Sequence, residues 1–578
     1  MTLRRFPQLR RSIAMGRHLV TGAAAVSLLA GCASIPTSGP VRVQPQISAT
    51  AESDNVVALV RPPEPGATPT SIVSGFIQAN ADATLDYAVA RSYLAPEVAD
   101  SWSPSAGVRI VDDSNGLDLR RWGSRVTLRV PQEAVLSAEG LYSAVASGTE
   151  VVTDFTVRKV DGQWRIDGVR DGLIVSLADI ARTYRTADRY FLNASRQYLV
   201  PDRSLVPTER RGYLTTLVRG VLSGPSSWLA PAVGTAVPRG TRLNVDAVLV
   251  SDGTATVDLT AQALAATNNA RRLMAAQIVY TATSSGEVNA VRITVTGQPL
   301  LLDGLGPVLT RADFASLDSV AALGTAVGYV VKAQSLQRIV GAGIEPVAGS
   351  LGSGQVPVGR AEVSWNGRFA AVTLAAQGAG NTVAIGDLTT GTDVLPLRGL
   401  DARKSLAWGP DSRLWAVGNN GQLKVWSKSL GAQSVLVRVG GTVTVVIPSF
   451  DGARAIVVAS GRAYVMRVQS SNGRLTLAAP RLLQSGLGPV RSVAWADAQR
   501  VQLLGQPSGE STQVFEVLVG AAAVSSLGGV PRMTRVAAAP SQAILVEAAD
   551  GVWENAGVGW RLAVKNGTSP GYGGPTGG

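Results

Sequence analysis

The sequence predicts a multidomain protein in which an α+β domain and an α/β domain precede an all-β propeller of roughly six blades. Three observations support this prediction. The chain has 578 residues, and the 547 that follow residue 31 are enough for three or four domains of about 150 residues each. Helical patterns occur only before residue 300. Beyond it, strand–turn–strand stretches recur at steps of 45, 41, 46 and 42 residues.

Residues 1–31 have the pattern of a bacterial lipoprotein signal peptide. Five arginines and no acidic residue precede the apolar run "LVTGAAAVSLLA", whose 12 residues are too few to span a bilayer. The run ends in Leu29-Ala30-Gly31-Cys32, which resembles a lipobox. The resemblance implies that the Gly31–Cys32 bond is cut and that Cys32 receives an S-diacylglycerol group and an N-acyl chain. Cys32 would then anchor the protein to a membrane without crossing it. The alternative is an ordinary secreted protein in which Cys32 is incidental.

The residues that remain after cleavage exclude most catalytic chemistries. His18, the only histidine, lies in the signal segment, and Cys32 is the only cysteine. The mature chain therefore lacks the side chains for a Ser-His-Asp triad, a Cys nucleophile, a His base or a zinc site with His or Cys ligands. We expect no enzyme activity, no catalytic residue, no metal site and no cofactor. The net charge of +12 falls to about +7 without the five signal arginines and is not clustered, so we expect no nucleic-acid partner.

Residues 32–70 and 71–180 predict a lipidated, Pro- and Ser-rich tether followed by the α+β domain. Stretches such as "VRPPEPGATPTS" suit a tether better than a core. Ser71 is expected to cap the first of two helices. Alternating apolar residues in "RVTLRVP" and a hairpin turn at Asp161-Gly162 indicate an antiparallel sheet after the helices. Two helices followed by a curved sheet resemble the NTF2-like α+β cone, a fold that often contains a pocket.

Residues 181–302 predict the α/β domain. An apolar strand is followed by a turn with Pro201-Asp202, an amphipathic helix that ends at Gly224-Pro225, a hairpin about Asp252-Gly253, a second helix and a closing strand. The segments "YFLN", "LSGP", "DGTATVDL" and "VRITVTGQPL" in this order resemble the GerMN domain of bacterial sporulation and germination proteins. Asn193-Ala194-Ser195 fits a glycosylation sequon, which we interpret as accidental in a bacterial chain.

Residues 303–322 are expected to be a linker, and residues 323–566 to form the propeller. The recurring stretches are "AEVSWNGRFAAV", "KSLAWGPDSRLWAV", "TVVIPSFDGARAIVV", "RSVAWADAQRVQLL" and "TRVAAAPSQAILV". A period of about 40–45 residues is typical of four-stranded propeller blades. The least regular blade contains "VGYVVKAQSLQRIVG", and we expect the C-terminal end to complete it as a ring closure. Trp365, Trp408 and Trp495 are expected to pack between blades, with ligand stacking as the alternative. The Gly- and Pro-rich residues 567–578 are predicted to be a disordered tail.

The order of lipobox, α+β module, GerMN domain and propeller resembles the LpqB lipoproteins of actinobacteria over essentially the whole chain. The segments that carry this resemblance include "GCASIPTSGPV", "LVRGVLSGPSSWLAPAV" and "VRITVTGQPL". Membership implies docking to the extracellular part of the sensor kinase MtrB of the MtrA–MtrB two-component system. It also implies an effect on signalling for cell division and envelope homeostasis. No catalytic motif is carried over, and Cys32 is the only residue to which the resemblance assigns a role.

Three functions remain open from the sequence. The first is a non-catalytic module, lipid-anchored at the extracytoplasmic face of the cell membrane, that docks an envelope protein. The second is a sensor of a cell-wall glycan such as peptidoglycan, or of a small ligand. The third, which we rank last, is an envelope glycosidase that uses Asp411 and Asp451, which occupy related turns. Aspartates beside Gly or Ser at hairpins are more typical of turn geometry, and the repeats do not resemble the "SxDxGxTW" box of sialidase-type propellers.

Overall fold

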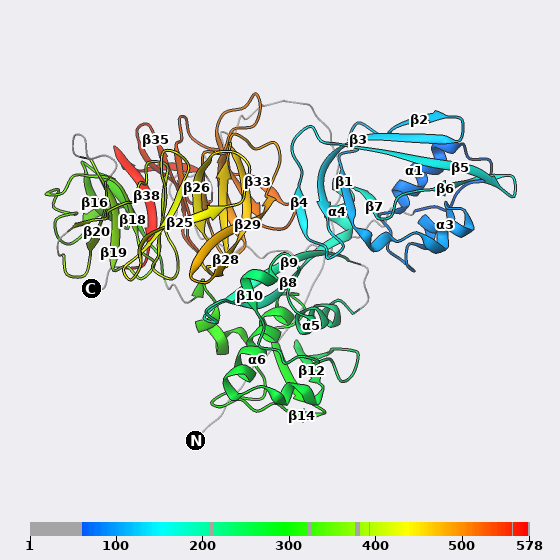
Figure 1. Cartoon of the computed structure of the whole chain (residues 1–578), viewed down its shortest axis with the longest axis horizontal. Coiled ribbons are helices and arrows are strands. Elements are labelled where there is room, and N and C mark those ends of the chain that lie inside the picture. Colours follow the sequence, from blue (N-terminus) through cyan, green and yellow to red (C-terminus); the bar gives the residue numbers. More distant parts are fainter. Residues whose placement is uncertain are drawn as a thin grey trace, which may run out of the picture. The chain divides into compact units, whose positions relative to one another are not determined.

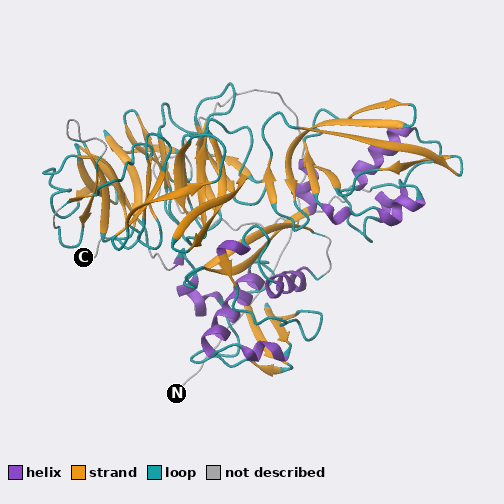
Figure 2. Ribbon diagram, viewed as in Figure 1, coloured by secondary structure: helices purple, strands orange, loops and turns teal. Residues whose placement is uncertain are grey.

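The computed structural model describes residues 60–575 except 209–211, 322–324, 376–381, 392–393 and 558. Within these ranges, helices occur in the part that precedes the propeller, and the propeller itself consists of strands and loops (Figure 2). None of the helices in the described ranges is long and apolar enough to cross a membrane. The predicted signal segment, with the lipobox residues Leu29, Ala30, Gly31 and Cys32, lies outside the described residues.

Three short helices and a curved sheet form the first domain. The helices are α1 (Pro69–Ala79), α2 (Ala88–Ser92) and α3 (Pro96–Ser101). The cap prediction was wrong: Thr68 caps α1 by accepting a hydrogen bond from the Ser71 backbone N–H, because Pro69 occupies the first helical position, where no N–H is needed. The remaining elements are β1 (Val108–Val111), β2 (Asp118–Trp122), β3 (Arg125–Leu136), β4 (Tyr142–Ala144), β5 (Glu150–Val160), β6 (Gln163–Gly168), β7 (Leu173–Ser176) and α4 (Leu177–Thr183).

Strand β3 organises the sheet of this domain. Its first half pairs with β2 and β5, and its second half pairs with β1 and β4, so that one long strand joins two differently directed parts of the sheet. The alternation predicted for this strand is confirmed, since Val126, Leu128 and Val130 are buried. Helix α1 covers this face with Phe76, whose ring lies edge-on to those of Trp102 and Phe155 at centroid distances of 5.3 and 6.1 Å.

The second domain contains two small sheets and two main helices. One sheet has the order β10-β8-β9 and the other β11-β12-β13-β14. The bounds are β8 (Tyr184–Asn193), β9 (Leu199–Pro207), α5 (Tyr213–Ser223), β10 (Val233–Gly234), β11 (Leu249–Ser251), β12 (Thr254–Leu259), α6 (Asn268–Thr283), β13 (Ala290–Val295) and β14 (Gln298–Pro299). The prediction of a turn at Pro201-Asp202 is wrong, because both residues lie inside β9. The loop between β8 and β9 is formed by Ala194–Tyr198. The Asn193 side chain accepts a hydrogen bond from the Gln197 backbone N–H in this loop.

The segment predicted as a linker packs partly on the second domain. The short helix η4 (Arg311–Leu317) has a capping box between Thr310 and Asp313. Phe314 is fully buried in the core of this domain, and Leu309 pairs with Val291 of β13. Phe314 and Leu309 therefore belong to the core of the second domain. The stretch predicted as a linker is short and shows little periodicity of apolar residues, so the sequence did not indicate this packing.

Six blades of four strands each follow, as expected for a propeller of roughly six blades, and the third and fourth are joined by a parallel pairing of β25 with β29. The first contains β15 (Val327–Lys332), β16 (Ser335–Val340) and β17 (Gly343–Pro346). The next three contain β18 (Val358–Val363), β19 (Phe369–Leu374), β20 (Val383–Asp387), β21 (Leu395–Pro396), β22 (Ser405–Trp408), β23 (Leu414–Val417), β24 (Leu423–Ser427), β25 (Gly431–Val437), β26 (Val443–Pro448), β27 (Arg454–Ala459), β28 (Arg462–Ser471) and β29 (Arg474–Leu482). The last two contain β30 (Ser492–Trp495), β31 (Arg500–Gly505), β32 (Gln513–Leu518), β33 (Val524–Ser526), β34 (Arg535–Ala537), β35 (Ile544–Ala548), β36 (Gly551–Asn555) and β37 (Trp560–Lys565).

The closing strand is β38 (Gly567–Gly573), which pairs with β15 and supplies the fourth strand of the first blade. In Figure 1 the red β38 lies beside the green strands that begin the propeller. The ring closure is thus confirmed, but the prediction of a disordered tail is wrong for residues 567–573. Glycine is needed here for packing: a Cβ on Gly567 would lie 2.9 Å from the Val330 side chain, and a Cβ on Gly573 would lie 2.7 Å from Val363.

Candidate binding cleft and domain junction

Trp228 lies where the three domains meet. It follows α5 in the loop "SGPSSWLAP", and its indole Nε1–H donates to the Ala479 carbonyl of the propeller at 2.8 Å. Arg467 returns a bond to the Trp228 carbonyl at 2.6 Å. Arg481 of β29 lies over the Trp228 ring at 5.0 Å and also donates to the Tyr142 carbonyl of the first domain. One side chain of the propeller thus contacts both other domains.

Burial of the Arg481 guanidinium lowers its pKa to about 10, which leaves it charged at neutral pH. A buried cation over an indole ring gains more than an exposed one, because little water competes for it. The loop also reaches the first domain directly, where the Ser227 hydroxyl donates to a carboxylate oxygen of Glu139 at 2.6 Å. The Leu205 N–H of the second domain donates to the Gly140 carbonyl at 2.8 Å.

A second set of hydrogen bonds, which includes an ion pair, joins the second domain to the propeller. Arg203 donates from Nε and Nη2 to the two carboxylate oxygens of Asp188 at 2.6 and 2.7 Å, and both side chains are about nine-tenths buried. Gln499, in the turn between β30 and β31, donates to Asp188 at 2.9 Å and accepts from Arg203. Nε and Nη2 of Arg203 are thus satisfied, whereas its buried Nη1 has no partner among the described residues.

Replacing Trp228 is expected to weaken the junction measurably. Trp228→Ala removes a half-buried ring and its hydrogen bond, and should lower the free energy of unfolding by about 2–3 kcal/mol. Trp228→Phe keeps a ring beside Arg481 and should cost about 1 kcal/mol, the value of the N–H bond. Urea unfolding followed by circular dichroism measures both. Equal stability of Trp228→Ala and the wild type would show that the junction contributes nothing.

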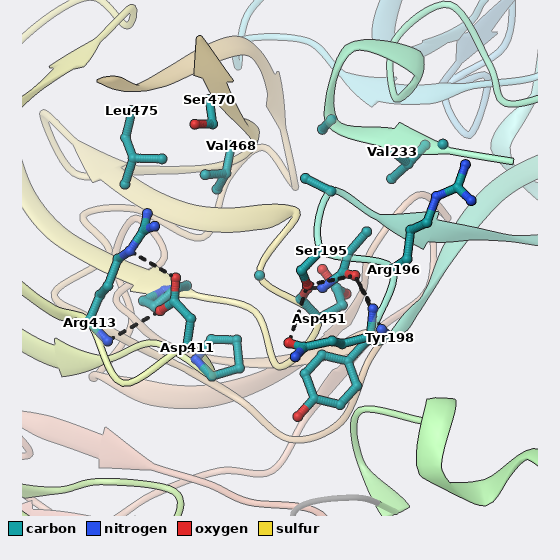
Figure 3. Close-up of a pocket in the computed structure, with 18 of the residues that line it drawn as sticks. Ser195, Arg196, Tyr198, Val233, Asp411, Arg413, Asp451, Val468, Ser470 and Leu475 are labelled. Atoms are coloured by element: carbon teal, nitrogen blue, oxygen red, sulfur yellow. Dashed lines mark hydrogen bonds and ion pairs between the residues drawn. The ribbon is translucent and has the colours of Figure 1, made fainter. Parts of the chain in front are cut away.

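An open cleft of about 620 Å³ lies between the β8–β9 loop of the second domain and the third and fourth blades of the propeller (Figure 3). Its volume is within the range of about 300–1,000 Å³ typical of ligand sites. Tyr198, Ser195 and Arg196 lie on one side, and Asp411 and Arg413 lie on the other. The lining is completed by Asn193, Ala194, Gln197, Pro231, Ala232, Val233, Gly234, Pro410, Trp415, Pro448, Asp451, Gly452, Val468, Ser470 and Leu475.

Asn193 shapes the β8–β9 side of the cleft. Its Oδ1 accepts bonds from the Ser195 hydroxyl and from the backbone N–H groups of Gln197 and Tyr198. Its Nδ2 donates to the Asp451 carbonyl of the propeller at 2.9 Å, and only 8% of the residue is exposed. The amide that a sequon would offer for glycosylation is therefore used inside the protein. Sequence reasoning missed this structural role, for which the only signal was an Asn at the end of an apolar strand.

The two aspartates considered as glycosidase carboxylates both line the cleft, but each is bonded within its own turn. Asp451 is fully buried; its Oδ2 pairs with Arg454 Nη2 at 2.5 Å, and its Oδ1 accepts from the Ser449 hydroxyl and the Ala453 N–H. Asp411 is half-exposed and pairs with Arg413 at 3.2 Å. Both aspartates therefore have the turn-stabilising role that the sequence favoured.

Trp415 is a buried side chain of the cleft wall whose polar atom lacks a partner in the described ranges. It is 4% exposed, and its indole Nε1–H has no hydrogen-bond acceptor among the described residues. Arg196, on the opposite side, is exposed and makes no side-chain hydrogen bond or ion pair within the described ranges. The Trp415 Nε1 atom is itself buried, so Arg196 is the exposed donor of the two, and its guanidinium would suit a ligand with oxygen acceptors.

The three propeller tryptophans pack between blades, as predicted. The Nε1–H of Trp365 donates to the Trp408 carbonyl at 3.3 Å, that of Trp408 to the Glu362 carbonyl at 2.9 Å, and that of Trp495 to the Ile447 carbonyl at 3.2 Å. With Phe450, whose ring lies edge-on to Trp365, they surround a space of only about 70 Å³. The centre of the propeller is therefore a packed core. No cluster of potential metal ligands occurs in the part of the chain that the structure describes.

Comparison with known protein families matches three consecutive parts of the chain. A model described as "Lipoprotein LpqB, N-terminal domain" matches residues 62–181. A model described as "Sporulation and spore germination" matches residues 188–301, and one described as "Lipoprotein LpqB beta-propeller domain" matches residues 334–572. These matches fall on the three domains of the structure. They confirm the GerMN domain and the propeller, while the NTF2-like character of the first domain stays a prediction.

Curated relatives named lipoprotein LpqB match between half and nearly all of the chain. Lipoprotein LpqB of Thermobifida fusca (strain YX) is 28% identical, over 96% of this chain and 98% of its own length. Lipoprotein LpqB of Cutibacterium acnes is 34% identical over 50% of this chain and 48% of its own. Among solved structures, TolB from Acinetobacter baumannii is 14% identical, with 50% of this chain and 84% of that chain covered and a TM-score of 0.33.

The fold, the junction and the matched domains define a bacterial lipoprotein built from an α+β domain, a GerMN domain and a β-propeller. The chain belongs to the LpqB lipoprotein family. None of the three matched descriptions names a catalytic family.

Proposed function

We propose that this protein is a membrane-anchored, non-catalytic binding module that docks the extracellular part of a sensor histidine kinase of the MtrB type. In doing so it would modulate two-component signalling for cell division and envelope homeostasis. The kinase assignment rests on the family resemblance. The structural observation that supports docking is the open cleft between the GerMN domain and the propeller, held in shape by the buried bonds of Asn193 and Asp451.

The bonds that fix the walls of the cleft support docking to a preformed site. Asn193 and the Asp451–Arg454 pair fix the two walls, so that a partner segment would enter without first ordering the site. The carboxylates that acid–base catalysis would need are engaged in ion pairs. These features support a binding surface better than a hydrolytic centre.

A binding measurement with the purified extracellular domain of the kinase tests the proposal. Ser470 is exposed on β28, and its side chain makes no hydrogen bond within the described ranges, so Ser470→Trp should fill the cleft without unfolding the propeller. We expect this variant to bind the kinase domain at least about tenfold more weakly. Ser353→Trp, at an exposed propeller position outside the cleft, is the matched control and should bind like the wild type. Unchanged binding by Ser470→Trp would exclude the cleft as the docking site.

The anchor is proposed at Cys32, within the lipobox Leu29-Ala30-Gly31-Cys32. Two or more acyl chains give stable attachment, at about 0.8 kcal/mol per buried methylene. We expect Cys32→Ser to release the protein from membranes into the soluble fraction after a carbonate wash, whereas the wild type stays in the pellet. Retention of Cys32→Ser in the washed membranes would contradict the lipoprotein anchor.

A second candidate function, recognition of a cell-wall glycan such as a peptidoglycan fragment, is favoured by Arg196. The Arg196 guanidinium lines the cleft, is exposed and has no side-chain partner in the described ranges, so it could donate to the hydroxyl and carboxylate oxygens of such a ligand. Calorimetric titration with purified muropeptides should then show binding that falls about tenfold in Arg196→Ala, because a charge-assisted hydrogen bond is lost. Arg532→Ala, at an exposed arginine elsewhere on the propeller, is the control. Absence of binding to the wild type would exclude this candidate.

A further inference from the structure

The β2–β3 hairpin of the first domain displays an aromatic ring to solvent at its tip. Trp122 is 79% exposed, and it is the only aromatic side chain among the large apolar residues that are exposed in the described part of the chain. It pairs with Arg125 across the two-residue turn Gly123-Ser124. The following strand β3 is fixed in the core by Val126, Leu128 and Val130, so the hairpin that carries the ring is held to the domain by its second strand.

Two arginines lie beside Trp122 in the hairpin: Arg125 is its cross-strand partner, and Arg120 lies two residues before it on β2. Arg120 and Arg125 are 75% and 61% exposed, and their partners Asp118 and Asp154 are also exposed. Exposed ion pairs of this kind contribute little, so both arginines can exchange their carboxylates for another anion. The neighbouring Asp161-Gly162 turn contributes one acidic residue to this end of the domain.

Two further cations at this end have no acidic partner in the described ranges. Arg121 lies over the ring of Trp164 at 5.2 Å, and Lys159 lies over the same ring at 5.6 Å. Neither charge is balanced by an ion pair within the described ranges. The hairpin tip thus combines an exposed indole with more positive than negative charge, as do protein segments at membrane–water interfaces.

The chain enters the domain beside the same tip. The Gly66 N–H donates to Gln163 Oε1 at 2.7 Å, and Gln163 adjoins Trp164 at the start of β6. Figure 1 shows α1, which follows this entry segment, next to β6 and β2. Cys32 precedes Val60 by 28 residues, which reach at most about 100 Å when fully extended. A bilayer that holds the lipid on Cys32 is therefore within reach of the hairpin.

From these observations we infer that the Trp122 hairpin is a second membrane contact, which lays its indole and arginines onto an anionic lipid bilayer. The occupant is the headgroup region of the bilayer to which the chain is anchored. Indole rings locate at this level of a bilayer, and Arg and Lys are attracted to its anionic lipids. The contact would fix which end of the first domain faces the membrane. The inference rests on the proposed anchoring for its biological setting, but it can be tested without the anchor.

The test uses the full chain with Cys32→Ser, so that no lipid contributes to binding. Because the sequence has one cysteine, Ser124→Cys in this chain provides the only thiol, and an environment-sensitive dye can be placed at the tip alone. We expect the dye to shift to the blue with vesicles of phosphatidylglycerol and phosphatidylcholine, but not with phosphatidylcholine alone. We expect the shift to weaken with added salt, which screens exposed charges.

Variants then separate the indole from the charge. In the same Cys32→Ser chain without the dye, Trp122→Ser and Arg121→Glu should each reduce sedimentation with anionic vesicles about tenfold, with thermal unfolding unchanged because both side chains are exposed. Trp122→Phe should retain most binding. Arg532→Glu makes the same charge change on the propeller and should bind like the parent chain. Absence of vesicle binding by the parent chain would overturn the inference, as would equal binding by Trp122→Ser. A dye shift with a soluble anionic polymer but not with vesicles would also overturn it. None of these outcomes depends on whether the protein binds a kinase.

Discussion

Ending the chain after Asn566 is expected to abolish the cooperative unfolding of the propeller. This truncation removes β38, the closing strand of the first blade. It takes away Tyr572, which is 8% exposed and whose hydroxyl donates to the Ala543 carbonyl at 2.6 Å. It also removes Ser569, whose N–H donates to Glu547, and Gly574, whose carbonyl accepts from the Tyr329 hydroxyl.

The expected loss from the truncation exceeds about 5 kcal/mol. A buried aromatic side chain contributes about 3–5 kcal/mol, and each backbone or side-chain hydrogen bond contributes about 1 kcal/mol. Since domains are stable by only about 5–15 kcal/mol, the open ring should lose its sharp thermal transition in calorimetry. A chain ended after Pro575 keeps the strand and is the control. A wild-type transition in the shorter chain would show that ring closure does not stabilise the propeller.

Asp451→Asn is expected to lower the free energy of unfolding by about 3 kcal/mol, whereas Asp411→Asn should cost at most about 1 kcal/mol. The first substitution leaves the buried Arg454 guanidinium without its anion, and an uncompensated buried charge is strongly destabilising. The second breaks a half-exposed pair with Arg413. Denaturant unfolding of both variants measures the difference.

The same pair of variants bears on the glycosidase alternative. If Asp451 has only a structural role, any loss of cellular function in Asp451→Asn should follow the loss of folded protein. Its matched partner Asp411→Asn should retain both fold and function. Loss of function in Asp411→Asn with full stability would favour the enzyme interpretation over the binding module.

Local patterns were sufficient to predict the propeller, because each blade repeats the same strand–turn–strand stretch. The closing strand was harder to predict. Its sequence "GTSPGYG" has the composition of a disordered tail, and the glycines are required only because Val330 and Val363 lie close to the backbone of β38. These neighbours lie more than 200 residues earlier in the chain, so no local pattern could indicate them.

The candidate cleft could be predicted only in part. Asp411 and Asp451 were noticed as related turns, and the structure places both at the cleft. The sequence could not show that one is exposed and the other buried, since the burial of Asp451 depends on Asn193 and the GerMN domain beside it. The motif around Trp228 supported the family resemblance, yet its contacts with Arg481 and Ala479 are with residues about 250 positions away.

In-cell photo-crosslinking from the cleft tests the proposed docking most directly. A photoreactive amino acid is placed at Ala194 or Ser470, on opposite walls of the cleft, and at Ser353 as the control position. After irradiation of intact cells, mass spectrometry identifies the captured proteins. We expect peptides from the extracellular part of a sensor histidine kinase at both cleft positions and not at Ser353. Failure to capture the kinase from either wall, with the protein present in the membrane, would contradict the proposed function.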